Sequence, residues 1–548
     1  MARAHALCTA LVLAAFGRAL PYPFQTTWDD GRFIVNNPLV REPTLSHLWA
    51  ILTRPHFQAY HPLHLISYWL DVPWSDASPP VVRATNLVLW VAAANLLLWA
   101  FRSLNLSPLA ACLAALAVAV HPVQVEAVVW ATGRKDGLAM LGAAATLLFH
   151  ARAATPWDRN AWLSRAAFLC AALGKTTVLP LSLLLVLVDC ALDRRTLKAA
   201  VTQQLPTIVA ALILSPIVLT VWADNEMIRT TAGGVRMAPA RAIATLGHQL
   251  QTALWPSLTA PMYDTRAINA PGASDYLLSI ACVLGLMVRS SAVRIAGGGF
   301  ILMMVPVMNL VPMYFPLQDR YLSLPLIPLA LGIGVGLDRL SRALRAPLGS
   351  VALVVVVALS VRTVQYAGEW QSESRLWGHA ASTHPQAFYA WMKLGEVRRA
   401  QGDLYGAVVA YAHLPRVDRK RKVGYAALLQ AVALRDERVY GLSPSRAEAY
   451  ARSFYAGLDD PRGLKVLASR MLATGHLRAL ELPLAFALSQ EPVPDAALEQ
   501  AARKHLQEGR PSVGLFYLGR MGRQTTDAEV RELAARARAR VTPLPLFD

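Results

Sequence analysis

The stretch "ATNLVLWVAAANLLLWAF", residues 84–101, has 18 residues and not one Asp, Glu, Lys or Arg. A helix needs about 20 such residues to cross the hydrocarbon core of a bilayer. Similar stretches recur as far as residue 365. Of the 548 residues, 55 % are hydrophobic and only 16 % are charged, and the mean hydropathy is +0.36. These values favour a polytopic membrane protein over a soluble one.

About eleven apolar runs are predicted to form transmembrane helices, so that the expected fold class is all-α. The first run follows Arg3 and ends in "FGRALPYP", and it can be read either as a retained helix or as a cleaved signal peptide. The predicted runs cover 5–22, 84–101, 108–122, 137–151, 162–175, 176–192, 205–222, 274–289, 295–313, 321–337 and 347–365.

Basic residues concentrate in alternate loops between these runs, which is the pattern of cytoplasmic loops. The formal charge of +18 therefore does not indicate nucleic-acid binding. The outer side, a periplasm or an ER lumen, receives the long loop 23–83 and everything after 366. The basic loops hold Arg102, then Arg152, Arg159 and Arg165, then "DRRTLK" at 193–198, then Arg289 and Arg294, and finally "DRLSRALR" at 338–345.

The composition changes after residue 366, and two domains are predicted, 1–366 and 367–548. The stretch "AWMKLGEVRRAQGDLYGAVVAYAHL", 390–414, has the spacing of a tetratricopeptide (TPR) repeat. Stretches 424–457 and 463–490 look like degenerate copies. A lone repeat cannot bury its apolar face, so a soluble TPR-like solenoid is expected. It would bind a protein partner or simply cap the membrane domain.

Polar residues gather at the outer ends of the predicted spans. They are Asp29 and Asp30, "HPVQVEAVVWATGRKD" at 121–136, Lys175, and "PVMNLVPMYFPLQDRYLSLP" at 306–325. Ionisable groups at membrane depth are costly and indicate a functional site. This collection suits a polyprenyl-phosphate sugar donor, because a cation is needed beside the phosphate and a carboxylate must accept the proton of the incoming hydroxyl.

These blocks, together with "YHPLHLISYWLD" (60–71), "ALGKTTVLPLSLLLVLVD" and "EWQSESRLWGHAASTHPQAFYAWMKLG", occur in one order over residues 20–415. In that combination the chain resembles the transmembrane-and-TPR O-mannosyltransferases, which belong to the GT-C superfamily of multipass glycosyltransferases. The resemblance implies an inverting transfer of mannose from dolichyl- or another polyprenyl-phosphate mannose to a Ser or Thr hydroxyl of an exported protein. It implies no other cofactor.

The resemblance also implies that the acidic pair of the first outer loop is catalytic, with Asp29 as general base and Asp30 orienting the acceptor, or the reverse. One of the two could instead cap a loop helix. Arg320 is expected to clamp the donor phosphate, held in place by Asp319, or to anchor at the interface beside Tyr321.

Further cations are expected at the donor phosphate, namely Lys175, Arg134 and Lys135. Either of the last two could merely pair with Asp136 or Glu126. His121, before Pro122, is interpreted as a helix-terminus residue and not as a metal ligand, and no spacing in the chain predicts a metal site. The five cysteines all lie in apolar runs and predict neither a disulfide framework nor a thiol site.

Some positions depart from the family's pattern. Thr176 replaces an acidic residue, His61 replaces an arginine, and Arg83 and Trp90 stand where histidines are common, beside a retained Asn86. These departures leave open a different sugar with a lipid or cell-wall glycan as acceptor. They also leave open a non-catalytic membrane scaffold that binds partners through the repeats. A transporter is disfavoured because the halves show no repeat.

Overall fold

The computed structural model describes residues 1–57, 59–224, 234–264, 271–403, 406–407, 410–411, 413–414, 495–509, 511–518, 521 and 525–540. Within these residues the fold is all-α, as predicted, and the one β-type pairing is an isolated bridge between His56 and Ala59. The chain divides into two compact units, Met1–Pro385 and Gln386–Asp548.

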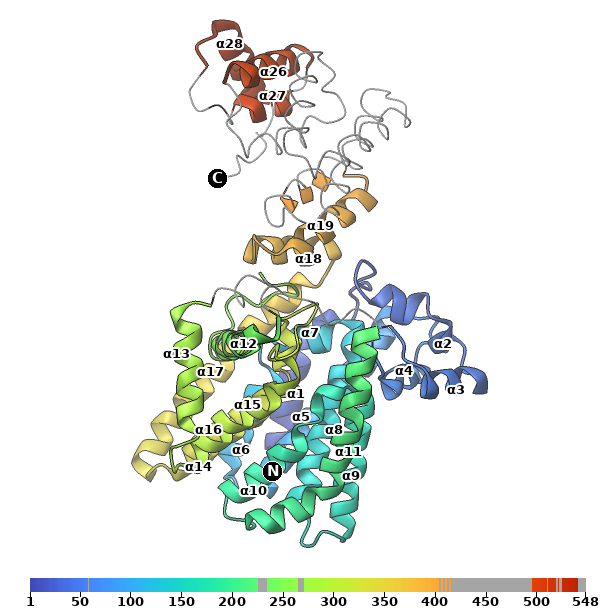
Figure 1. Ribbon diagram of the computed structural model, residues 1–548, viewed down its shortest axis with the longest axis vertical. Helices are drawn as coiled ribbons and strands as arrows, with labels where there is room; N and C mark the ends of the chain where they lie inside the picture. Colours follow the sequence, from blue (N-terminus) through green and yellow to red (C-terminus); the bar gives the residue numbers. More distant parts are fainter. Residues whose placement is uncertain are drawn as a thin grey trace. The chain divides into compact units, whose positions relative to one another are not determined.

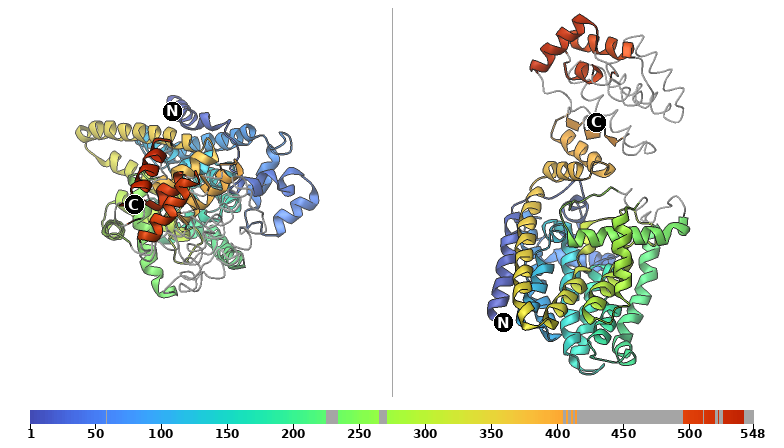
Figure 2. Two further views of the ribbon diagram at one scale, coloured as in Figure 1. Left: turned by 90° about the horizontal axis from the view of Figure 1, so that it is seen from above. Right: turned by 90° about the vertical axis from the view of Figure 1, so that its left-hand side faces the viewer.

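The first unit is a helix bundle (Figure 1). Helix α8 packs along both α5 and α9, while α1 lies beside α17 (Figure 2). The bundle helices are α1 (Ala2–Phe16), α5 (Pro79–Ser103), α6 (Pro108–Ala119), α8 (Arg134–Arg152), α9 (Arg159–Gly174), α10 (Leu181–Ala191), α11 (Leu197–Asp224), α13 (Ala273–Gly285), α15 (Gly299–Met304), α16 (Leu326–Arg339) and α17 (Arg342–Glu369).

Every one of the eleven predicted apolar runs coincides with helical structure, and three helices are both long and apolar enough to cross a membrane. These three are α5, α11 and the part of α17 from Ala343 to Glu369. Only 11 % of the most apolar window of α11 and of α17 is buried. Apolar side chains such as Leu212 and Val354 are therefore exposed along these helices, as lipid contact requires. The remaining eight runs form shorter or interrupted helices, so the count of eleven crossings stays a prediction.

The loops that the charge pattern assigns to one side of the membrane do meet at one end of the bundle. Arg152 donates to Ser103, Arg194 donates to the Ala151 carbonyl, and the Ser107 amide donates to Asp338. Figure 1 shows α14 (Ser291–Val293) at this end, and α7 (Gln124–Val129) and α12 (Ala238–Leu254) at the other. Which end faces the cytoplasm stays a prediction.

The predicted outer loop 23–83 folds into short helices beside the α7 end of the bundle (Figure 1). A π-helix, Gly31–Val35, directly follows the acidic pair. It is succeeded by α2 (Pro38–Arg41), α3 (Leu45–Thr53) and α4 (Pro62–Ser67) with a 3₁₀ turn at Tyr68–Leu70. Phe33, Ile34 and Tyr68 are buried in a common apolar cluster, which makes the loop a packed layer.

Helix α18 (Glu373–Thr383) still belongs to the first unit. The second unit contains α19 (Phe388–Ala400), α26 (Asp495–Gln507), α27 (Pro511–Leu518) and α28 (Ala528–Arg540). In the first predicted repeat, Tyr411 lies so close to Gly395 that a Cβ there would come within 2.3 Å of its ring. Trp391 stacks on His413 with ring centroids 3.7 Å apart. These contacts match the close packing that a repeat needs, whereas stretches 424–457 and 463–490 lie outside the described residues.

Close packing of α8 on α9 depends on Gly142, where a Cβ would lie 2.6 Å from the Ala171 Cβ and 3.1 Å from the Ala167 carbonyl oxygen. We predict that Gly142→Ala lowers the free energy of unfolding by about 1–3 kcal/mol, because the helices must separate. Gly137→Ala on the same helix is the control. Its Cβ would meet no atom within 4 Å, so removing glycine should be neutral or stabilising. Equal melting temperatures for the two variants in detergent would contradict the packing argument.

Candidate functional site

The site is built on the segment from the end of α6 to the start of α8. His121 follows α6 and ties the chain down, since its Nε2 donates to the Ala253 carbonyl (3.0 Å) and its Nδ1 accepts from the Val123 amide. Burial lowers the pKa of His121 to about 4, so the ring is neutral. Helix α7 and a 3₁₀ turn, Ala131–Gly133, then lead directly into α8. His121 lies just past the end of α6, and its supporting role at the site stays a prediction.

Asp30 fastens the acidic loop onto this segment. Its Oδ1 accepts from the Thr132 amide (3.0 Å) and hydroxyl (2.6 Å), and its Oδ2 accepts from the Gln25 amide (2.8 Å). The side chain is fully buried. Burial raises the pKa of Asp30, while Arg83 and these hydrogen bonds oppose the rise.

Helix α18 holds the same loop from another direction. The Glu373 carboxylate accepts from the Thr27 amide (2.6 Å) and hydroxyl (3.0 Å), and the Trp377 indole donates to that hydroxyl (3.0 Å). Trp28 packs against Trp377 and Trp130, with ring centroids 5.2 and 4.9 Å apart. The residue before Asp29 is therefore fixed by an aromatic cluster.

Two buried ion pairs lie around this loop. Arg320 pairs with Glu126, whose other oxygen accepts from the Arg320 amide (3.0 Å). Burial would lower the pKa of Arg320, but the Glu126 carboxylate raises it above its usual range. Lys175 pairs with Asp136, and the two side chains are only 7 % and 1 % exposed. Glu126 and Asp136 are thus the partners of Arg320 and Lys175, and not of Arg134 or Lys135.

Asp29 and Lys135 are left without such partners. The half-buried carboxylate of Asp29 forms no hydrogen bond or ion pair with any described residue, and the same holds for the Lys135 ammonium. Lys135 Nζ instead lies over the rings of Trp130 (5.0 Å) and Phe33 (5.4 Å). Burial and then the Arg320 guanidinium lower the pKa of Lys135 to about 8, against the opposing effect of the Asp29 carboxylate. The Asp29 carboxylate raises the pKa of both cations, and both cations lie over the ring of Trp130, against which Trp28 also packs.

The expectation that Arg134 binds the donor phosphate is corrected by the structure. The Arg134 side chain is fully buried and pairs with Asp71 through both nitrogens of its fork. Its remaining donors go to Asn86 (2.7 Å) and to the carbonyls of Ser67 (3.0 Å) and Val82 (2.9 Å). All five N–H groups are therefore engaged, and Arg134 joins the outer loop to α5 and α8.

The expectation that Asp319 holds Arg320 is also corrected. Asp319 accepts hydrogen bonds from the hydroxyls of Tyr263 and Tyr366 (3.0 Å), whereas Arg320 is held by Glu126 and Gln318. Burial and then the Glu126 carboxylate raise the pKa of Asp319 well above its usual range. Tyr321, whose ring lies 5.6 Å from the Arg320 guanidinium carbon, donates to the Phe315 carbonyl (2.9 Å).

Two of the departures from the family's pattern meet in space. The Nε2 of His61 lies 3.5 Å from both the amide nitrogen and the hydroxyl oxygen of Thr176. Burial and then the ammonium groups of Lys135 and Lys175 lower the pKa of His61 to about 3, so the ring is neutral. A neutral pair thus occupies the positions at which the family has an arginine and an acidic residue.

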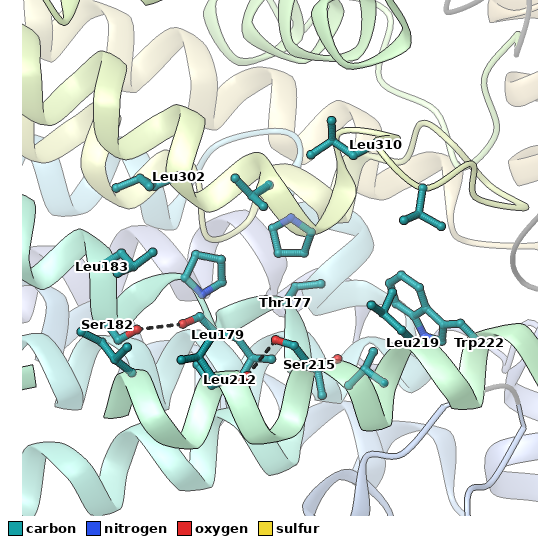
Figure 3. Close-up of a pocket in the computed structure, with 18 residues that line it drawn as sticks. Thr177, Leu179, Ser182, Leu183, Leu212, Ser215, Leu219, Trp222, Leu302 and Leu310 are labelled. Carbon is teal, nitrogen blue, oxygen red and sulfur yellow. Dashed lines mark hydrogen bonds between the residues drawn. The ribbon is translucent and has the colours of Figure 1, made fainter. Parts of the chain in front are cut away.

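A cavity of about 430 Å³ begins at Thr176 and Thr177, directly after Lys175. Its walls come from α10, α11 and the segment from α15 to Val311 (Figure 3). Two of the wall hydroxyls donate to backbone carbonyls, Ser182 to that of Leu179 just before α10 and Ser215 to that of Ala211 in α11 (Figure 3). The remaining lining is largely leucine, valine and proline, so the cavity suits an apolar chain.

Several residues of the site were not predicted from the sequence. Asp71, Trp28 and Trp130 lie inside blocks that were recognised, but only the charged residues next to them were given roles. Glu373 and Trp377 also lie in a recognised block, 369–395, but the sequence alone does not show their contacts with Thr27, which bridge about 350 positions. Among the described residues there is no group of three or more His, Cys, Asp or Glu arranged to hold a metal ion.

Comparison with known proteins gives distant, partial similarity. No protein-family model matches the chain. Protein O-mannosyl-transferase TMTC1 is 32 % identical in Mus musculus and 31 % identical in Homo sapiens, each over 155 residues or 26 % of this chain. Human protein O-mannosyl-transferase TMTC4 is 29 % identical over 154 residues. These matches span only 16, 17 and 20 % of the three relatives' lengths.

Among solved structures, ArnT from Cupriavidus metallidurans, bound to undecaprenyl phosphate, aligns with 98 % of this chain and 89 % of its own. The sequence identity is 17 % and the TM-score is 0.36. A score of this size does not establish a shared fold.

The buried pair of Arg134 and Asp71 should matter for stability. We predict that Arg134→Met lowers the free energy of unfolding by about 3–5 kcal/mol, because it leaves the Asp71 carboxylate buried and uncompensated. Arg41→Met is the control, since Arg41 pairs with Asp76 at 2.5 Å on the surface, where such a pair contributes at most about 1 kcal/mol. Thermal unfolding in detergent should separate the two variants, and equal melting temperatures would refute the structural role of Arg134.

Proposed function

We propose that the protein is an integral-membrane inverting glycosyltransferase of GT-C type. It would move a sugar from a polyprenyl-phosphate donor to a Ser or Thr hydroxyl of an exported protein. The observation that carries the proposal is that Asp29 and Lys135, whose side chains pair with no described residue, come from segments joined by the contact of Trp28 with Trp130 (4.9 Å). Lys135 Nζ lies over that same Trp130 ring.

Asp29 is the proposed general base. A serine or threonine hydroxyl is a weak nucleophile, so its proton must pass to a base as oxygen attacks the anomeric carbon. The polyprenyl phosphate leaves with the electrons of the broken sugar–phosphate bond. Asp29 suits this role because no described residue occupies its carboxylate, whereas both oxygens of Asp30 accept hydrogen bonds from the scaffold. We therefore propose that Asp30 holds the acidic loop in place and is not the base.

Lys135 and Arg320 are the proposed contacts of the donor phosphate. An ammonium without a carboxylate partner attracts an anion, and Arg320 adds a second positive charge against the same Trp130 ring. Lys175, paired with Asp136, contributes charge at the mouth of the apolar cavity, whose first lining residues directly follow it. The cavity would hold the first isoprene units of the lipid.

The most specific parts of the proposal are that the sugar is mannose and that the acceptor is a protein. They are supported by the partial similarity to proteins named O-mannosyl-transferases and by the resemblance of the sequence blocks. The TPR-like tail would select the acceptor. Both the tail and the acidic loop would face the periplasm or the ER lumen.

We predict that Asp29→Asn reduces transfer by about 10²–10⁴-fold, because the amide cannot accept the proton. Asp30→Asn is the matched comparison. It should instead lower the melting temperature, since one amide nitrogen would face the Thr132 or Gln25 donors. The assay uses purified protein, a panel of polyprenyl-phosphate sugars, and a Ser/Thr peptide.

Lipid and glycan acceptors belong in the same panel, because a sister activity would use the same base. Transfer that persists in Asp29→Asn would rule out Asp29 as the base. Absence of transfer from every donor by the wild-type protein would favour the scaffold interpretation.

Lys135 should also set a pH dependence. The ammonium form binds phosphate, and with a pKa of about 8 it is lost as the pH rises through that value. We predict that kcat/KM for the donor falls above about pH 8 in the wild-type protein. Arg stays protonated, so Lys135→Arg should abolish this limb up to about pH 10. An unchanged alkaline limb in the variant would show that another group titrates.

A further inference from the structure

Asp136 has one carboxylate oxygen that the fold leaves unused. The side chain is 1 % exposed and its Oδ1 pairs with Lys175. Its Oδ2 is buried and accepts no hydrogen bond from any described residue. Buried carboxylate oxygens are almost always hydrogen-bonded, and leaving one unpaired is costly. An oxygen of this kind at a candidate site suggests that a ligand supplies the missing donor.

Two unpaired donors lie in the same region. The buried Nε1 of Trp130 has no acceptor among the described residues. Two cations lie over the ring of Trp130, with Lys135 Nζ at 5.0 Å and the Arg320 guanidinium carbon at 5.2 Å from its centroid. Lys135 directly precedes Asp136 and has no carboxylate partner in the described structure. The unpaired acceptor Asp136 Oδ2 is thus accompanied by a neutral donor, Trp130 Nε1, and a charged donor, Lys135 Nζ.

There is also space at the residue that follows Asp136 on the helix. Gly137 is buried, yet a Cβ built on it would meet no atom within 4 Å. Because Gly137 has no side chain, this position on the helix leaves room for a ligand group next to Asp136.

The chemistry of these groups divides the ligand into two parts. A phosphate diester only accepts hydrogen bonds and is negatively charged, so it suits Lys135 and Trp130 but is repelled by a carboxylate. Asp136 Oδ2 needs a neutral donor, and the hydroxyl groups of a sugar are such donors. Because Lys175 holds Oδ1, the direction of Oδ2 is fixed, which favours recognition of one particular hydroxyl.

We propose that Asp136 is a specificity-determining residue that accepts a hydrogen bond from a hydroxyl group of the donor's sugar. Lys175 acts as its positioning residue. This inference rests on the proposed function and assigns different parts of the donor to the adjacent residues Lys135 and Asp136. Lys135 recognises the phosphate, which is common to donor and product lipid, while Asp136 recognises the sugar, which only the donor carries.

The test compares two ligands on full-length protein in nanodiscs. Undecaprenyl phosphate lacks the sugar, and undecaprenyl-phosphate mannose carries it. We predict that Asp136→Asn weakens binding of the mannose lipid at least about 10-fold, as expected for a hydrogen bond to a charged group, and leaves undecaprenyl phosphate within about twofold. Lys135→Met, one residue away, should weaken binding of both lipids by a similar factor.

A second variant covers possible misfolding of Asp136→Asn, which leaves Lys175 without its partner. The double variant Asp136→Asn/Lys175→Met removes both members of the pair. Loss of the Lys175 charge should weaken binding of both lipids, but the mannose lipid should still lose about 10-fold more than undecaprenyl phosphate. Equal losses for both lipids, or no loss for either, in the folded variants would overturn the role of Asp136 while leaving the proposed function intact. If the wild-type protein binds neither lipid, the proposed function itself fails, and this inference with it.

Discussion

A charge buried at the end of a helix bundle is stable only when an opposite charge or several hydrogen bonds accompany it. This constraint organises the first unit. Glu126 pairs with Arg320, Asp136 with Lys175, and Asp71 with Arg134, in each case between segments far apart in sequence. The pairs bring together the outer loop, α7, the start of α8, the turn after α9 and the segment before α16. Asp29 and Lys135 form no ion pair with any described residue, so their charges are available to a ligand.

The segment 121–136 is the centre of this arrangement because it contributes to every part of it. It supplies carboxylates for Arg320 and Lys175, the threonine that fixes Asp30, and the arginine that binds the outer loop. Arg134 and Lys135 are adjacent in the sequence but have different roles. Arg134 is completely engaged in the scaffold, whereas Lys135 lies over two aromatic rings and forms no ion pair with any described carboxylate. Successive residues on a helix point about 100° apart, so two adjacent cations can serve structure and ligand separately.

The sequence was sufficient for features that are local. Apolar runs located every bundle helix, alternating basic loops identified the segments that share one end, and the position of Asp29 and Asp30 marked the acidic loop. Ion pairs and hydrogen bonds between distant segments are not local, and the partners predicted from the sequence were wrong. Arg134 and Lys135 look equivalent in "GRKD", and only the distant Asp71 distinguishes them. Asp319 adjoins Arg320 in sequence but bonds to Tyr263 and Tyr366 instead. The departures at His61 and Thr176 looked independent until the fold placed them in contact.

The end of the bundle that carries Asp29 is proposed to bind a lipid phosphate through Lys135. A cryo-EM structure of the protein with undecaprenyl phosphate would test this proposal. We expect a phosphate within about 3 Å of Lys135 Nζ, with Arg320 and Asp29 facing it and isoprene density entering the cavity at Thr176. A phosphate bound at the opposite end of the bundle, beside Arg194 and Arg195, with Lys135 making no contact, would contradict it.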